Sequence, residues 1–227
     1  MNMGREHFRS QALVIDDEAP PLARPGKPRD YLKVLRPDID LTGYENYSDP
    51  DLDRLIRATQ RGYSILRQIS HTERDGSKPE GYSCIITVFG DPESINRIAA
   101  PMSEEERYKQ ELGVPFLYRD DEEAVRVLRK LGNHGPTGLD GAFCFDLDGE
   151  LYATERRVAM PLDLGLNGTR EEIRKAKGSI GTKHEAAAYA SKHGVTSVAL
   201  SAEVGTVITF AGGKIINTFT YRPARKT

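Results

Sequence analysis

The pattern of hydrophobic and polar positions changes character near residue 51. Residues 10–50 carry six prolines among charged side chains, which favours extended or irregular backbone over helices. From Asp51 to Ile69, apolar residues recur at helical spacing, so we expect an amphipathic helix that ends near His71. The pattern predicts an N-terminal arm over residues 1–50 and one domain over residues 51–227.

Helical and strand patterns then alternate along the domain. Residues 82–89 form a nearly continuous apolar run, typical of a strand buried on both faces. Asp91 and Pro92 are placed as the N-cap and the first residue of a helix. Further helices are expected from residue 103, over 121–131, over 169–177 and from 182 to about 193, and further strands over 142–146, 150–154, 197–201, 206–210 and 214–221. This order predicts an α/β fold with a single mixed β-sheet flanked by helices and an N-terminal extension.

Charge and cysteine content narrow the class of protein. The formal net charge of −2 gives no electrostatic drive toward nucleic acid or anionic lipid, so we expect neither as a partner. Cys84 and Cys144 each lie in an apolar run without metal-ligand or redox spacing, which predicts buried thiols in a reducing compartment. The chain start lacks an apolar signal region, and the longest apolar stretch is too short to span a bilayer. We therefore expect a cytoplasmic protein without a membrane partner.

A short acidic string precedes the strand expected at residue 142. Asp140 and Gly141 lead into Ala142, and the Asp140 carboxylate could hold a divalent metal or activate a hydroxyl. An Asp-Gly pair before a strand is also typical of an ordinary turn. The residues alone leave both interpretations open.

A second string enters a helix and offers groups that suit polyphosphate. Gly181 allows close approach of a ligand, Thr182 adds a hydroxyl, and Lys183 and His184 are two potential cations at the positive end of the helix dipole. The spacing from Thr182 to Glu185 is also that of a capping box, which would explain both residues without any ligand.

A third string, residues 201–205, follows an expected strand. Ser201 and Glu203 would place a hydroxyl and a carboxylate at a strand exit, where α/β sheets commonly bind ligands. A polar strand exit without a ligand is the structural alternative.

In this order along the chain, the three strings resemble the diadenylate cyclase domain, whose members condense two ATP molecules into cyclic di-AMP. That family is marked by Asp-Gly-Ala, then Gly-(Thr/Ala)-Arg-His-Arg-Ala-Ala, then Ser-Glu-Glu-x-Gly. The corresponding residues here are 140–142, 181–187 and 201–205, and the likeness covers roughly residues 50 to 221.

The resemblance implies a fold, a substrate and a set of site residues. It implies a mixed sheet flanked by helices, ATP as substrate, Mg²⁺ or Mn²⁺ as cofactor, release of pyrophosphate, and a homodimer or larger homo-oligomer with two facing sites. Asp140 would bind metal and help to activate the 3′-hydroxyl, as the catalytic residue. The nucleotide-binding residues would be Gly141, Ala142, Gly181, Thr182, Lys183, His184, Ser201 and Glu203, with His184 also at the metal.

The chain departs from the family pattern at three positions. Lys183 replaces an arginine and loses its bidentate fork, Glu185 replaces a second arginine with an anion, and Ala202 replaces a glutamate. The leading hypothesis is a diadenylate cyclase. The alternatives are a degenerate cyclase fold that binds ATP or a cyclic dinucleotide as a sensor, and a nucleotidyltransferase that uses another NTP.

Overall fold

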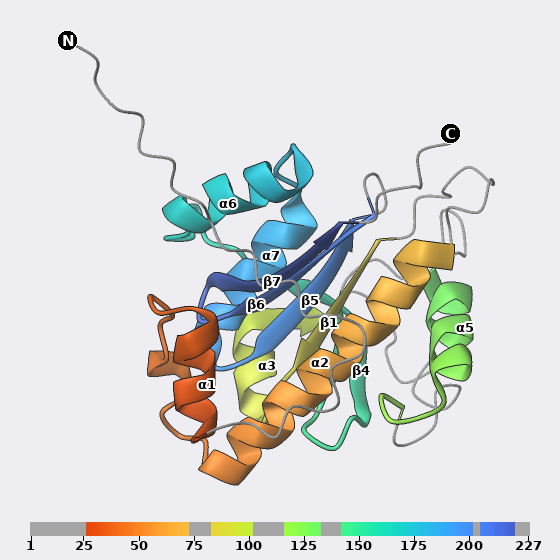
Figure 1. The fold of residues 1–227 in the computed structure, drawn as a ribbon, viewed down its shortest axis with the longest axis horizontal. Helices are drawn as coiled ribbons and strands as arrows, with labels where there is room; N and C mark the ends of the chain where they lie inside the picture. The colour runs from red at the N-terminus through yellow and green to blue at the C-terminus, as the bar shows by residue number, and fades with distance from the viewer. Residues whose placement is uncertain (1–25, 73–82, 102–115, 133–141, 202–204, 221–227) are drawn as a thin grey trace.

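A single mixed sheet organises the protein (Figure 1). The computed structural model describes residues 26–72, 83–101, 116–132, 142–201 and 205–220. Within these residues seven strands pair in the order β2-β4-β3-β1-β5-β6-β7. β1 and β3 are parallel, and the other neighbouring pairs are antiparallel. The strands are β1 (Cys84–Val88), β2 (Ala99–Pro101), β3 (Ala142–Phe145), β4 (Leu151–Val158), β5 (Thr196–Ser201), β6 (Thr206–Ala211) and β7 (Lys214–Thr220).

Helices cover both faces of this sheet and create two hydrophobic layers. Alternate residues of β1 enter different layers: Ile86 packs with helices on one side and Ile85 with helices on the other. The first side carries α1 (Pro28–Leu35), α2 (Asp49–Thr72) and α5 (Asp121–Gly132), and the second carries α3 (Pro92–Ile98), α6 (Asn167–Lys177) and α7 (Thr182–Ala190). The α/β class with one mixed sheet flanked by helices is therefore confirmed, as is the burial of β1 on both faces.

The expectation of irregular backbone over residues 10–50 is wrong for part of that segment. Helix α1 begins with Pro28 at its first turn, a position where the missing N–H of proline costs nothing, and η1 (Thr42–Tyr44) follows it. Leu32 and Tyr44 are buried in the core with α2. The division of the chain at residue 50 stays a prediction, since the preceding residues 1–25 lie outside the described part.

Several boundaries also differ from the sequence expectation. α2 begins at Asp49, α6 at Asn167, and β4 continues to Val158 because it pairs with the short strand β2, which the sequence did not reveal. Cys84 and Cys144 are buried thiols outside any disulfide, as predicted. Among the helices that the structure describes, none combines the length and apolar composition needed to cross a bilayer.

Candidate functional site

The strand pairing brings one residue from each of two predicted strings, Ala142 and Ser201, to one edge of the sheet. Ala142 is the first residue of β3 and lies opposite Ile85 in β1, while Ser201 is the last residue of β5, one residue beyond the pair formed by Leu200 and Cys84. β1 and β3 enter the sheet at this edge, and the antiparallel strand β5 leaves it there. The edge therefore joins chain segments that are about sixty residues apart.

Lys183 connects the start of α7 to the same edge. Its ammonium group donates to the hydroxyl of Ser83 at 2.6 Å and lies 3.3 Å from the Ser83 carbonyl oxygen, and Ser83 immediately precedes β1. The first residues of α7 thus lie beside the entry of β1. The N–H groups in the first turn of any α-helix have no acceptor within the helix, so this edge carries the positive end of a helix dipole.

The capping-box interpretation of Thr182 and Glu185 is wrong. Gly181 is the N-cap and no side chain caps the helix, whose first backbone bonds run from the His184 and Glu185 N–H groups to the Gly181 carbonyl. Glu185 instead accepts a hydrogen bond at 2.6 Å from Nε of Arg170 in α6. A salt-bridged partner on another helix draws the carboxylate away from the Thr182 backbone.

His184 is neutral at neutral pH, which corrects its expected role as a cation. Only 2% of its surface is exposed, and this burial, with the nearby Lys177 ammonium, lowers its pKa to about 4. Its Nε2 atom has no hydrogen-bond partner among the described residues. A buried neutral imidazole with an uncommitted ring nitrogen fits a metal ligand or a hydrogen-bonding group for an anion.

Lys177 adds a second amine near the start of α7. A Cβ atom placed on Gly181 would lie 3.2 Å from Lys177 Nζ and 3.9 Å from His184 Nδ1. The ammonium group of Lys177 therefore shares the N-cap region with the imidazole. Sequence reasoning missed Lys177, Ser83 and Arg170, because nothing local in the chain indicates that they meet α7.

The remaining predicted residues are only partly placed. Ala142 and Ser201 are buried at the sheet edge, and Thr182 is exposed at the start of α7. Asp140, Gly141 and Glu203 lie outside the described residues, so their predicted roles stay predictions. Within the described part of the chain, no three metal-ligating side chains cluster, and the Mg²⁺ or Mn²⁺ site likewise stays a prediction.

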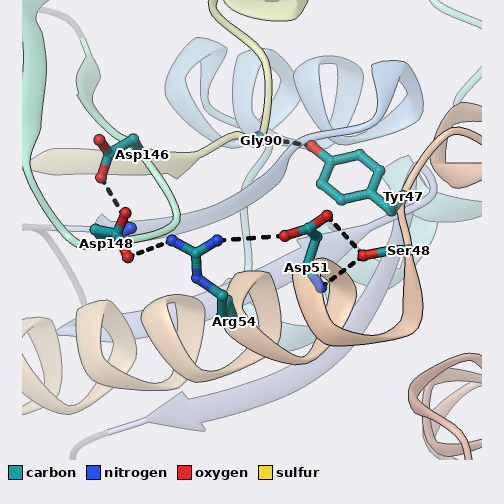
Figure 2. Close-up of polar contacts among 7 residues, drawn as sticks. All are labelled: Tyr47, Ser48, Asp51, Arg54, Gly90, Asp146 and Asp148. Atoms are coloured by element: carbon teal, nitrogen blue, oxygen red, sulfur yellow. Dashed lines mark hydrogen bonds and ion pairs between the residues drawn. The ribbon is translucent and has the colours of Figure 1, made fainter.

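A different polar cluster lies at the opposite end of β1 (Figure 2). Arg54 of α2 forms ion pairs with Asp51 and with Asp148 in the β3–β4 turn. Nearby, the Tyr47 hydroxyl accepts the Gly90 N–H at 2.7 Å. Arg54 fastens α2 to the β3–β4 turn, and Tyr47, which precedes α2, fastens the chain to the loop after β1, so we interpret the cluster as a structural clip.

Comparisons with known proteins add resemblances of shape. No family model and no curated protein matches the chain. One similar solved structure is a double mutant of DacA from Staphylococcus aureus, at 14% identity and a TM-score of 0.41, which covers 70% of this chain and 85% of that chain. Another is a hypothetical membrane spanning protein from Bacillus cereus, at 11% identity and a TM-score of 0.46, which covers 77% of this chain and 69% of that chain. At these values neither resemblance carries an argument about function.

Proposed function

We propose that this protein is a diadenylate cyclase with the fold of that family, acting in the cytoplasm as a homodimer or larger assembly. The observation that carries the proposal is the contact between Lys183 and Ser83, which places the start of α7 at the edge where β3 begins and β5 ends. The three strings that resemble the family's motifs occur in the family's order along the chain, and their described residues include Ala142, Lys183 and Ser201. A cation, helix N–H groups and a buried imidazole at that edge suit the triphosphate of ATP.

The proposed reaction joins two nucleotides held in facing sites. Each 3′-hydroxyl loses its proton and attacks the α-phosphate of the other ATP, a new P–O bond forms, and pyrophosphate leaves from each nucleotide. Lys183 and the first turn of α7 would bind phosphate oxygens, and Asp140 would accept the hydroxyl proton. Asp140 and His184 are the residues that would hold Mg²⁺ or Mn²⁺, which would neutralise phosphate charge when bound.

Positioning is the main contribution of these residues. Gly141, Ala142, Ser201 and Glu203 would complete the nucleotide site around the sheet edge. The rigid strand pairing holds Ala142 and Ser201 in place, since both lie in buried strands. Correct placement of two reactants supplies a large part of the acceleration in reactions of this type.

The direct test is incubation of the pure protein with ATP and each divalent metal, with products resolved by mass spectrometry. We expect cyclic di-AMP and pyrophosphate from the wild type and none from Asp140→Asn. Lys183→Met should lower the apparent ATP affinity at least tenfold, whereas Lys175→Met, on an exposed position of α6, should leave it unchanged. If folded protein makes no cyclic di-AMP with any of the metals tested, the proposal that it is a diadenylate cyclase is refuted.

Glu185 is the observation that favours the second candidate, a nucleotide sensor without turnover. Its carboxylate stands where the family carries an arginine. Thermal stabilisation by ATP or cyclic di-AMP without any product would support the sensor. Competing NTPs in the same assay would identify an enzyme that joins other nucleotides.

A further inference from the structure

Arg170 extends from a firmly anchored turn of α6. The Thr169 hydroxyl donates to the Gly213 carbonyl at 2.7 Å, which ties the first turn of α6 to the β6–β7 hairpin. The Arg170 N–H bonds to the Leu166 carbonyl at 2.8 Å, within the same turn. The backbone that carries Arg170 is therefore fixed relative to the sheet against which α7 packs (Figure 1).

Toward the residues that the structure describes, the side chain of Arg170 uses one of its five N–H donors. Nε donates to Glu185 at 2.6 Å, and no further hydrogen bond of Arg170 is made within the described residues. The side chain is 40% exposed, whereas that of Glu185 is 19% exposed. Its two terminal nitrogens make no hydrogen bond to the described residues, and on this partly exposed side chain they are available to a ligand.

The position of this guanidinium follows from helix geometry. Glu185 is the fourth residue of α7, and helical side chains lean toward the N-terminus of their helix. Its carboxylate therefore holds Arg170 against the N-terminal half of α7, on the side that faces α6. Glu185 alone would repel a phosphate there, but the ion pair cancels its charge and adds an N–H fork.

We propose that Arg170 binds the polyphosphate of the nucleotide and that Glu185 is its positioning residue, an inference that rests on the proposed function of the site. In the family pattern the corresponding arginine stands on α7 itself, at the position of Glu185. Here the cation comes from α6 instead, and Glu185 orients it. With Lys177 and Lys183, Arg170 gives the start of α7 a positive balance despite Glu185.

The test measures binding by calorimetry, with ATP, inorganic triphosphate and AMP as probes. Arg170→Ala should lower the affinity for ATP and for triphosphate by about 10-fold to 100-fold and change that for AMP far less, because charge-assisted bonds to the outer phosphates are lost. Arg174→Ala is the matched control: Arg174 lies one turn further along α6 and pairs with Glu171 of its own helix. We expect wild-type affinities for this variant.

Glu185→Gln separates a phosphate contact from a structural ion pair. Glutamine keeps the acceptor for Nε and removes the negative charge, so affinity for triphosphate should equal or exceed that of the wild type. If the ion pair were merely structural, Arg170→Ala and Glu185→Gln would weaken triphosphate binding alike. Arg170→Lys, measured beside Arg170→Ala, keeps the charge without the fork and should lose less affinity.

The outcomes distinguish the two proposals. Triphosphate affinity of Arg170→Ala within twofold of wild type, with thermal melts showing that the variant is folded, would overturn the role of Arg170 and leave the nucleotide site standing. A wild-type protein that binds neither ATP nor triphosphate would overturn the proposed function as well.

Discussion

Acidification should destabilise this fold through one buried histidine. In the folded chain the pKa of His184 is lowered to about 4 by burial, whereas an unfolded chain leaves histidine near 6.5. Between these values the unfolded state takes up a proton that the folded state does not. The neutral form therefore contributes stability that is fully present above about pH 6.5 and is lost as the pH falls toward 4.

The size of the effect follows from the difference between the two pKa values. Each pH unit between them changes the free energy of unfolding by about 1.4 kcal/mol. From pH 7.5 to 4.5, His184 should account for a loss of roughly 2–3 kcal/mol. That loss is a large fraction of the marginal stability of a typical domain.

Urea denaturation at about pH 7.5 and about pH 4.5, on the wild type and on His184→Gln, measures the contribution of His184 to the free energy of unfolding. Glutamine cannot take up the proton, so the variant should lose roughly 2–3 kcal/mol less than the wild type on acidification. His193→Gln serves as the control: partial desolvation also lowers the pKa of His193, but its side chain is exposed, so this variant should lose nearly as much stability on acidification as the wild type. Equal acid losses in wild type and His184→Gln would show that His184 is not buried and neutral as the structure has it.

Three further changes test the packing. Tyr44→Phe removes a buried hydroxyl that accepts the Gly212 N–H at 3.1 Å, and should cost about 1–3 kcal/mol in urea unfolding because that N–H is left without its acceptor. Gly194→Ala should cost roughly 2–4 kcal/mol, since Gly194 has φ +78° and a Cβ there would lie 2.2 Å from the Gly43 carbonyl oxygen. Gly168→Ala in α6, where a Cβ meets no atom within 4 Å, should instead stabilise the protein by up to about 1 kcal/mol. A destabilised Gly168→Ala, or a neutral Gly194→Ala, would contradict the described backbone.

Local signals predicted much of the fold. The Asp91 side chain accepts the Glu93 N–H at 3.1 Å with Pro92 at the first helical position, so the start of α3 is confirmed in detail. The apolar run of β1 and the Gly212–Gly213 turn between β6 and β7 also correspond to their sequence patterns. Each of these features depends on residues a few positions apart.

Tertiary contacts decided the rest. Strand β2 has three residues and exists through its pairing with β4, which no local pattern announces. Thr182 and Glu185 have the spacing of a capping box, but Glu185 pairs instead with Arg170, fifteen residues earlier in the chain. Likewise, Lys183 is recognisable as a cation from the sequence, but its partner Ser83 lies 100 residues away.

The directions in which the strands pair bring residues of separate strings to one edge of the sheet. Ala142 opens a strand and Ser201 closes one, so in an all-parallel sheet they would lie at opposite edges. Because β1 and β3 are parallel while β5 is antiparallel to β1, the opening of two strands and the close of the third meet. The order of motifs along a sequence does not indicate the direction of the strands that carry them. The chemistry proposed for this edge therefore depends on a mixed sheet, and the Lys183 contact to Ser83 secures α7 to the same edge.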